Sequence, residues 1–289
     1  MDRLAQFTEL RPQLFALAYR MMGTRTDAED VLQDSYLRWH EAPSAEILSP
    51  KSYLTTIVAR LSLDALKSAH RKRELYTGPW LPEPLIGAAM PDTIELAESL
   101  SFAFLHLLET LTPAERIAFL LHEVFETPYA EIAKILDTSL SNARQLATRA
   151  RKRIREKRAR FIVDRARHQA VFNQFLTACS NGDWAALVGL LHEDAVLYSD
   201  AGGKRSSALH PIYGAERIVR LFKGIASHAD PDLAAGHSDL INGAPGFVFT
   251  RDRRITCTTS IDIDENGLIR AIFSVMNTEK LHAETMVRT

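Results

Sequence analysis

The chain has 289 residues, more than one hydrophobic core usually serves, so we expect two or three domains. Its 46% hydrophobic and 25% charged residues are typical of a globular protein, and no apolar run approaches the roughly 20 residues that cross a bilayer. The net charge of −1 excludes a uniformly basic protein, and Cys179 and Cys257 are too few and too far apart for a disulfide framework or a zinc site. Segment 1–23 has charges among its apolar positions, which indicates an amphipathic helix and not a signal peptide. We therefore expect a cytoplasmic protein without a metal or a cofactor.

Three helical patterns occupy the first 74 residues. The first covers residues 7–23, and the second covers 26–42, where apolar positions at helical spacing face inward and acidic positions face outward. The expected inward residues are Val31, Leu32, Tyr36, Leu37 and Trp39, and the expected outer residues are Asp27, Glu29, Asp30 and Asp34. The third pattern covers residues 50–74, places Tyr53 among polar residues, and ends in His70, Arg71, Lys72 and Arg73.

A proline-rich segment, LYTGPWLPEPL at residues 75–85, separates these helices from the next ones. Each of its three prolines removes a backbone donor and fixes φ, which excludes a helix. Ordinary linkers are polar and stay solvated, whereas this one carries Tyr76, Trp80, Leu81 and Leu85. We therefore expect this linker to dock on another surface of the protein.

The segment from Thr112 predicts a helix-turn-helix. Thr112 is the expected N-cap, a proline follows it, and Glu115 is placed for a capping box. A second helix is expected over 129–136 with Ile132, Ala133 and Leu136 inward, and after an Asp-Thr-Ser turn a third helix begins at Leu140. In a DNA-binding helix-turn-helix the last helix lies in the major groove.

The arginine-rich third helix supplies the candidates for DNA contact. Its first turns would meet base edges, and its basic flank would meet phosphates, which supply salt-dependent affinity without sequence information. The candidates are Ser141, Asn142, Arg144 and Gln145 for bases, and Arg149, Arg151, Lys152 and Arg153 for phosphates. For this segment alone, a helical hairpin with a solvated charged end remains the alternative.

The chain changes character after about residue 164. Helices are expected over 165–181, from Trp184, and over 214–228, with one strand ending near Asp200 and later strands over 231–242, 246–251, 254–264 and 267–277. Turn signals at Asn242-Gly243 and Asn266-Gly267 favour a curved antiparallel sheet. The segment is therefore an α+β domain.

In order, these segments resemble the extracytoplasmic-function group of bacterial sigma factors. The acidic, Trp-containing DAEDVLQDSYLRW falls where the family places it, and the likeness covers residues 1 to about 160. The resemblance implies two all-α sigma domains, a region 2 helical bundle over 1–74 and a region 4 helix-turn-helix over 93–160, joined by a linker over 75–92. The remaining domain, 164–289, resembles a SnoaL-like or NTF2-like cone with an apolar cavity.

The resemblance implies partners and site residues for region 2. The acidic helix would dock on the clamp helices of the RNA polymerase β′ subunit through Asp27, Asp30 and Asp34, although such residues are also common as solvated helix charge. The third helix would hold the −10 element of promoter DNA through Lys51, Tyr53, Arg60, Arg71 and Lys72. Tyr53 equally fits a place in the helical core. Region 4 would read the −35 element.

The WLPEP core of the linker resembles the SigJ-like subgroup, whose members carry a fused C-terminal domain. SDAGGK resembles a DGGGK motif, INGAPG is family-like, and NTEKL resembles NPDKL; Ala201 replaces a glycine, which puts a special backbone angle there in doubt. The expected interdomain residues are Trp80, Asp200, Gly202, Gly203, Lys204, Asn242 and Gly243. Trp80 alternatively caps the region 2 core.

Two other function classes remain as alternatives. A cyclase or isomerase fused to a DNA-binding segment would need a carboxylate or histidine inside the cone, for which the sequence offers Asp200, His210, Tyr213 and His237 without fixing their geometry. A conventional operator-binding regulator would bind duplex DNA without polymerase. The favoured interpretation is a promoter-specificity subunit, not an enzyme, regulated by its own C-terminal domain without a separate anti-sigma factor.

Overall fold

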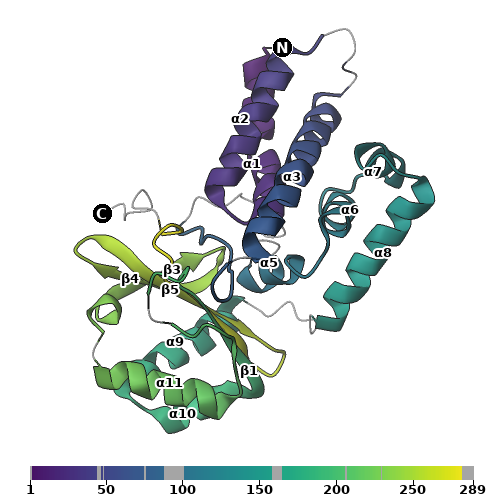
Figure 1. The fold of residues 1–289 in the computed structure, drawn as a ribbon. Coiled ribbons are helices and arrows are strands. Elements are labelled where there is room, and N and C mark those ends of the chain that lie inside the picture. Colours follow the sequence, from purple (N-terminus) through teal and green to yellow (C-terminus); the bar gives the residue numbers. More distant parts are fainter. Residues whose placement is uncertain are drawn as a thin grey trace. The chain divides into compact units, whose positions relative to one another are not determined.

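The structure, a computed structural model, describes residues 2–43, 47, 49–74, 76–87, 101–157, 165–205, 207–228 and 230–281. The described residues divide into two compact units (Figure 1). The first contains residues 2–74 and 104–157, and the second contains 76–87, 101–103 and 165–281. The linker therefore belongs to the same unit as the C-terminal domain. Among the described residues, no helix has the length and apolar character that a membrane span requires.

The first unit begins with a bundle of helices α1 (Arg3–Met22), α2 (Arg25–Glu41) and α3 (Pro50–Glu74) (Figure 1). Gly23 has a φ of 75°, which ends α1, and the Thr24 hydroxyl caps α2. Trp39 is buried as predicted. The prediction that Leu37 faces inward is wrong, because its side chain is 53% exposed on the outer face of α2.

The second part of this unit begins with α5 (Phe102–Leu108), whose first two residues are assigned to the second unit. The expected helix-turn-helix follows and consists of α6 (Pro113–Glu123), α7 (Tyr129–Ile135) and α8 (Leu140–Lys157). The predicted capping box is present, since the Thr112 hydroxyl accepts the Glu115 N–H and the Glu115 carboxylate accepts the Thr112 N–H. Between α7 and α8, Asp137 adopts a φ of 49° and makes the tight turn. Buried residues at helical spacing hold α8 against α6 and α7: Ala143, Leu146, Ala147, Ala150 and Ile154.

The second unit is an α+β domain, as predicted (Figure 1). Its helices are α9 (Arg165–Asn181), α10 (Trp184–Leu190) and α11 (Ala215–His228), with a short 3-10 helix, η2 (Pro231–Leu233). Its strands are β1 (Leu191–Asp200), β2 (Ile212–Tyr213), β3 (Gly236–Ile241), β4 (Ala244–Arg251), β5 (Arg254–Ile263) and β6 (Ile269–Val275). They form one sheet in the order β2-β1-β6-β5-β4-β3.

Two expectations for this sheet need correction. β1 pairs with β6 in parallel, so the sheet is mixed; only β2 with β1 and the run from β3 to β6 are antiparallel. The strand expected over 231–242 begins at Gly236, because Pro231–Leu233 form η2 with Asp230 as its cap. The Asn242-Gly243 turn is as predicted, with φ values of 52° and 76°.

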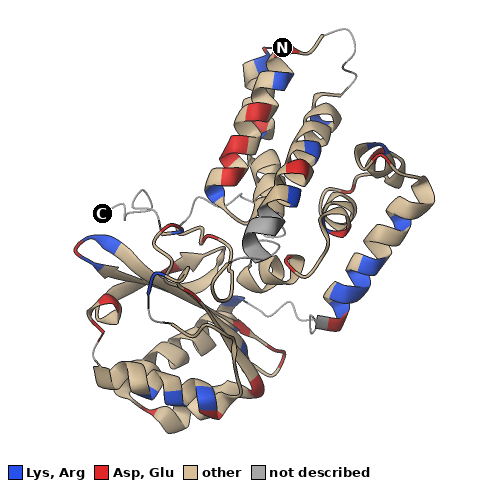
Figure 2. Ribbon diagram, viewed as in Figure 1, with Lys and Arg blue, Asp and Glu red and all other residues tan. Residues whose placement is uncertain are grey.

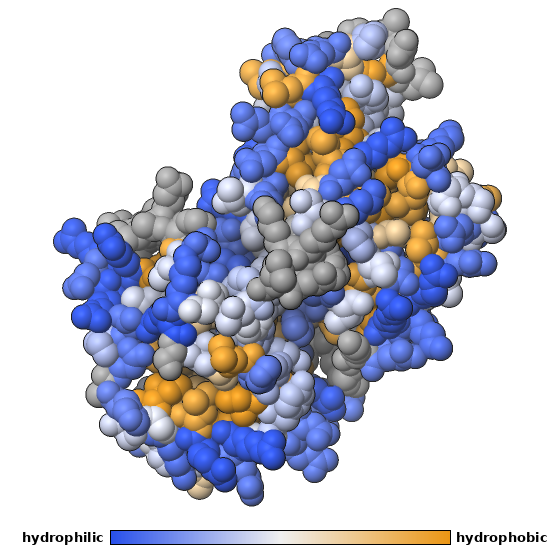
Figure 3. All heavy atoms as spheres, viewed as in Figure 1, coloured by the Kyte–Doolittle hydropathy of each residue, from blue (hydrophilic) through white to orange (hydrophobic). Residues whose placement is uncertain are grey.

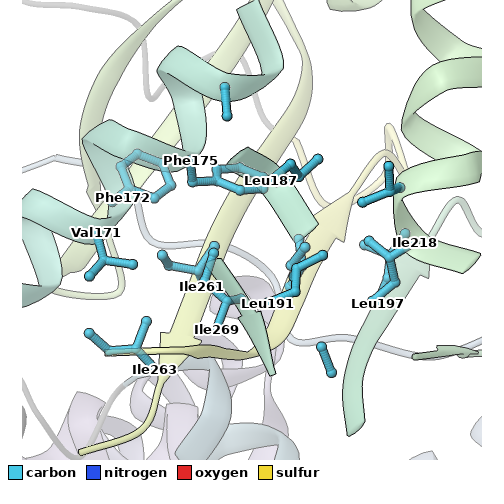
Figure 4. Packing of buried hydrophobic residues seen from close by; sticks show 14 residues of the cluster. Val171, Phe172, Phe175, Leu187, Leu191, Leu197, Ile218, Ile261, Ile263 and Ile269 are labelled. Carbon is cyan, nitrogen blue, oxygen red and sulfur yellow. The ribbon is translucent and has the colours of Figure 1, made fainter. Parts of the chain in front are cut away.

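The sheet is buried on both faces. On one face, α9, α10 and α11 pack against strand residues that include Leu197, Ile261 and Ile272, and Figure 4 shows this cluster with Phe172 and Phe175 projecting from α9 toward the strands. On the other face, Phe273 and Val275 pack with linker residues Leu81 and Ile86. Neighbouring residues of β6 thus face opposite clusters, as the two-residue period of a strand requires. The linker supplies part of the core.

Candidate nucleic-acid interface and linker site

One face of α8 carries exposed polar and basic side chains. The exposed positions Ser141, Arg144, Gln145 and Arg149 follow helical spacing and lie opposite the apolar positions that contact α6 and α7. Figure 2 shows the basic residues as a blue run along α8. This single-sided arrangement suits a helix that lies in a groove of DNA.

The first turn of α8 uses one of the expected base-contacting residues for its own structure. The Asn142 Nδ2 donates to the Thr138 hydroxyl at 2.8 Å, and the Asn142 N–H donates to the Ser139 Oγ at 3.2 Å. Asn142 is half-buried in this cap. The Arg144 guanidinium lies 5.8 Å from the centre of the Tyr129 ring, while Ser141 and Gln145 are exposed. Arg144 is thus oriented by a cation–π contact with α7.

Glu115 draws two arginines of α8 onto α6. Its carboxylate is buried and accepts from the Arg149 Nε at 3.2 Å and from an Arg153 guanidinium nitrogen at 2.7 Å. Burial opposes ionisation, but the hydrogen bonds from Thr112 and the charge of Arg153 hold the pKa of Glu115 below its ordinary value of 4.5. Arg151 pairs similarly with Glu123. Lys152 lies 3.8 Å from the Glu156 carboxylate, so all four expected phosphate ligands have protein carboxylates as partners.

The three aspartates of α2 that are expected to contact polymerase differ in their exposure and in their hydrogen bonds. Asp27 accepts a hydrogen bond of 2.5 Å from the Thr24 hydroxyl and stabilises the start of α2. Asp30 and Asp34 are exposed and make no ion pair with any described residue. Their neighbour Glu29 pairs with Arg11 at 2.5 Å. Asp30 and Asp34 thus form an acidic surface on α2 that a partner can contact.

Helix α3 carries the residues expected to hold the −10 element. Lys51 is exposed, whereas the ring of Tyr53 lies 5.8 Å from that of Trp39, in partial agreement with the core alternative. The Arg60 guanidinium donates to the Lys134 carbonyl of α7 at 2.9 Å. The side chains of Arg71 and Lys72 lie outside the described residues.

A second hydrogen bond joins α3 to α7: the Ser52 hydroxyl donates to the Glu131 carboxylate at 3.1 Å. The two helical parts are also joined through Arg116, which is buried and donates to the Met21 carbonyl of α1 at 2.8 Å. The expected −10 surface of α3 is therefore in contact with α7.

In the second unit, Asp200 lies where β1 ends and binds the linker. Its carboxylate accepts from the Tyr76 hydroxyl at 2.5 Å, from the Leu81 N–H at 2.8 Å and from the Lys280 Nζ at 2.7 Å. Asp200 is fully buried and Lys280 is 7% exposed. Burial, together with the hydrogen bond to Asp200, raises the pKa of the Tyr76 phenol, so the hydroxyl remains a donor. We call these four residues, together with Trp80 and Asn277, the linker site.

Lys280 and Asn277 complete the linker site from the segment that follows β6. The Lys280 Nζ donates to the Leu81 carbonyl at 2.5 Å and lies 4.1 Å from the centre of the Trp80 ring. The Asn277 Nδ2 donates to the Tyr76 hydroxyl at 2.7 Å. The expected contact of Trp80 with the C-terminal domain is thus made through the ammonium of Lys280.

Farther along the linker, Asn242 pairs with Leu85. The Leu85 N–H donates to the Asn242 Oδ1 at 3.0 Å, and the Asn242 N–H donates to the Leu85 carbonyl at 2.8 Å. Ile86 then forms an antiparallel bridge with Ile241 of β3. Asn242 therefore serves both the turn before β4 and the linker.

The glycines after Asp200 allow close packing. Gly202 and Gly203 have φ values of 61° and 70°, and a Cβ on Gly202 would lie 2.6 Å from the Asn277 Nδ2. Ala201 is buried and does not have a positive φ, so the alanine there is accommodated. Lys204 pairs with Glu279 of the C-terminal segment and not with the linker.

Sequence reasoning did not select Tyr76, Asn277 and Lys280 as site residues. Tyr76 lies in the linker, and Asn277 and Lys280 lie in the NTEKL segment. Each of these polar side chains stands beside apolar residues in the sequence, which is a sign that it could be a buried hydrogen-bond donor. A buried Asp200 requires donors, and these segments supply them.

The candidate residues for enzyme chemistry do not come together. Asp200 binds the linker, Tyr213 is 58% exposed, and His237 lies beside Asp239 with 3.9 Å between the Nε2 and the carboxylate. None of these residues, nor His210, lines the cavity described below. Among the described residues, no group of His, Cys, Asp and Glu is arranged to hold a metal ion.

Comparison with known protein families and sequences identifies the two helical parts of the chain. Residues 6–72 match the family model of sigma-70 region 2, and residues 101–154 match that of sigma-70, region 4. The ECF RNA polymerase sigma factor SigJ of Mycobacterium tuberculosis is 40% identical over 96% of this chain and 92% of its own length. The probable ECF RNA polymerase sigma factor SigI of the same species is 38% identical over 90% of this chain and 88% of its own length.

The likeness extends to the solved structure of a relative. The crystal structure of the extracytoplasmic function sigma factor SigJ of Mycobacterium tuberculosis matches with a TM-score of 0.78 and 35% identity, over 96% of this chain and 97% of that chain. The chain therefore belongs to the extracytoplasmic-function (ECF) family of RNA polymerase sigma factors and is a transcription initiation factor, not an enzyme.

Proposed function

We propose that this sigma factor directs core RNA polymerase to promoters and that its C-terminal domain limits the separation of the two promoter-binding parts by holding the linker. Helices α1–α3 bind polymerase and the −10 element, and α6–α8 read the −35 element. Asp27, Asp30 and Asp34 face the β′ clamp helices, and control by the chain's own domain makes a separate anti-sigma factor unnecessary. The protein acts in the cytoplasm, with core polymerase and promoter DNA as its partners.

The observation that carries this proposal is the linker site. Two binding parts joined by a tether act together only over the distances that the tether allows. A free linker would permit many separations, whereas a linker bound through Leu81 and Leu85 to Asp200, Lys280 and Asn242 would permit fewer. The C-terminal domain therefore selects among promoters by the spacing of their two elements.

The surface of α8 supports its role at the −35 element. Ser141, Arg144 and Gln145 are exposed near the start of the helix, where side chains of such helices meet base edges. Arg149 remains 52% exposed although it contacts Glu115, so a phosphate has access to its guanidinium. DNA thus replaces a carboxylate with a phosphate as the partner of Arg149.

The contacts of α3 support a step that precedes binding of the −10 element. Arg60 and Ser52 contact α7 in the free protein. Both hydrogen bonds must break before α3 presents these side chains to a DNA strand, and each contributes only about 1 kcal/mol because water competes for the groups. The free energy of binding to core polymerase and DNA is expected to exceed the cost of breaking these two hydrogen bonds.

The test is run-off transcription with purified core polymerase on promoters whose −35 and −10 elements are separated by spacers that differ one base pair at a time. The full-length wild-type chain is expected to be active over a narrow range of spacers. Lys280→Met, which frees the linker, is expected to broaden that range. Lys204→Met is the matched control, because it removes a similar ammonium from an exposed pair with Glu279. This variant is expected to keep the range of spacers on which the wild-type chain is active.

An identical spacer profile for wild type and Lys280→Met would contradict the role of the linker site. A chain that neither co-elutes with core polymerase nor initiates from any promoter in the series would contradict the whole proposal. The two failures are distinct because the first leaves transcription intact.

A further inference from the structure

The second unit contains a cavity of about 320 Å³ between its helices and its sheet. Phe175 and Cys179 of α9, Phe222 and Ile225 of α11, and Phe247 of β4 are among the side chains that line it. Small-molecule sites in proteins begin at roughly this size and are mainly apolar. The cavity is therefore large enough for a small organic molecule of one or two rings.

The lining is uncharged. It contains no Asp, Glu, Lys, Arg or His among the described residues, and its polar side-chain groups are the hydroxyls of Ser180, Ser199, Thr259 and Ser274, the indole N–H of Trp184 and two thiols. Burial raises the pKa of Cys179 to about 12 and that of Cys257 to about 11, so both thiols stay protonated near neutral pH. A charged ligand would lose its hydration here without gaining a counter-ion.

The cavity also has an entrance formed by small residues. Ala226 near the end of α11, and Ala234, Ala235 and Gly236 before and at the start of β3, line it and are exposed. Apolar surface is visible between α11 and the strands of the sheet in Figure 3. These exposed lining residues place this end of the cavity at the protein surface.

We infer that this cavity binds a small, uncharged and largely apolar molecule that carries a hydroxyl or carbonyl group. The apolar part of the ligand contacts the phenylalanines of α9, α11 and β4, and its polar group exchanges hydrogen bonds with the serine and threonine hydroxyls. The hydroxyls both donate and accept, so an alcohol and a ketone are equally served.

The position of the cavity gives this ligand a route to the linker. Ser199 of β1 and Met276 after β6 line the cavity, and the next residues, Asp200 and Asn277, belong to the linker site. Such a ligand contacts the strands whose ends hold the linker. This consequence rests on the proposed function of the linker, whereas binding itself does not.

The experiment uses Prodan, an uncharged naphthalene ketone whose emission shifts to the blue in apolar surroundings, and the full-length chain without polymerase. Prodan is expected to bind with a blue shift and to receive excitation energy from Trp184, which lines the cavity. Trp184→Phe is expected to keep the blue shift and lose most of the energy transfer. Anilinonaphthalene sulfonate, an anionic naphthalene, is expected to bind at least tenfold more weakly.

Two variants at the entrance test the location of the site with direct excitation of Prodan. Ala226→Trp and Ala235→Trp place a large side chain at exposed entrance positions, so both are expected to fold and to weaken binding at least tenfold. Ala170→Trp, at an exposed position of α9 outside the lining, is the matched control and keeps the wild-type affinity.

Three results would overturn the inference: no blue shift with the wild-type chain, unchanged affinity in both entrance variants with native circular dichroism, or equal affinity for the anionic probe. None of these results depends on transcription. The proposed function therefore stands or fails separately.

Discussion

The two carboxylates that organise this protein, Asp200 in the second unit and Glu115 in the first, are both buried and bind cations of very different exposure. Lys280, the partner of Asp200, is 7% exposed, whereas Arg149 and Arg153, the partners of Glu115, are 52% and 46% exposed. At the linker site, water reaches neither ion of the pair. On α8, water and other anions reach the arginines.

This difference decides which site is easily changed. A buried ion pair contributes little net stability, but the loss of one of its hydrogen-bonding partners is costly because the remaining charge stays out of water. The linker supplies such partners through Tyr76 and Leu81, so its departure is opposed. The half-exposed arginines of α8 exchange partners at small cost. The first site is suited to holding a segment, and the second is suited to binding and releasing DNA.

The largest effect is expected from removal of the cation at the linker site. Lys280→Met leaves Asp200 charged and buried, which costs about 3–5 kcal/mol and weakens linker binding. The Leu81 amide, which donates to Asp200, is expected to exchange its hydrogen at least a hundredfold faster. Hydrogen–deuterium exchange of a peptide over 76–87 measures this rate.

Lys204→Met is the control for that comparison. Lys204 and Glu279 are 50% and 68% exposed, so solvent screens their pair and its loss is expected to leave the stability of the fold nearly unchanged. Equal exchange rates in the two variants would mean that burial does not distinguish the two ammonium groups, and the contrast between the two sites would be lost.

A smaller effect is expected from Gly202→Ala, which tests the close packing beside Asp200. At a φ of 61° alanine is strained by about 1–2 kcal/mol, and its Cβ would displace Asn277 from Tyr76. Urea unfolding of the second unit, followed by the fluorescence of Trp80 and Trp184 in a Trp39→Phe background, is expected to show this loss.

Gly224→Ala is the matched control, because nothing lies within 4 Å of its added Cβ and alanine favours the helix α11 by up to about 1 kcal/mol. Unfolding midpoints that fall equally in both variants would show that Gly202 has no special packing role.

Local features of this fold are predictable from sequence, and distant ones are much less so. The Thr112–Glu115 capping box and the Asn242-Gly243 turn depend on residues within three positions, and both are present. The parallel pairing of β1 with β6 is not predicted, since it joins segments that are separated by α11 and four strands. Strand patterns alone do not fix which strands pair.

The same contrast holds for the sites. The linker and the segment after Asp200 were selected by their apolar and glycine content, but Tyr76 and Asp200 are 124 residues apart, and no periodicity predicts their hydrogen bond. The basic face of α8 was predicted from its arginines. That Arg149 and Arg153 converge on Glu115 follows from packing of α8 on α6, which spacing within one helix does not show.

The smallest effect is expected at Glu115, and it depends on pH. Because the pKa of Glu115 is lowered in the folded protein, its charge stabilises the fold above its ordinary pKa of 4.5, and this contribution is lost as the pH falls through the lowered value. Glu115→Gln is therefore expected to destabilise the helix-turn-helix by about 1 kcal/mol at pH 7, with the difference from wild type shrinking toward zero in acid. Hydrogen exchange of peptides over α6 and α8, corrected for intrinsic rates, measures the difference at each pH.

Glu156→Gln is the control for that titration, because Glu156 is 60% exposed and its pair with Lys152 spans 3.8 Å in solvent. It is expected to leave α6 and α8 unchanged at every pH. A difference between wild type and Glu115→Gln that grew as the pH fell would mean that the folded chain favours protonated Glu115. In that case the arginines of α8 would not stabilise the ionised form of Glu115, and the distinction between a site that holds a segment and a surface that exchanges anions would rest on the linker site alone.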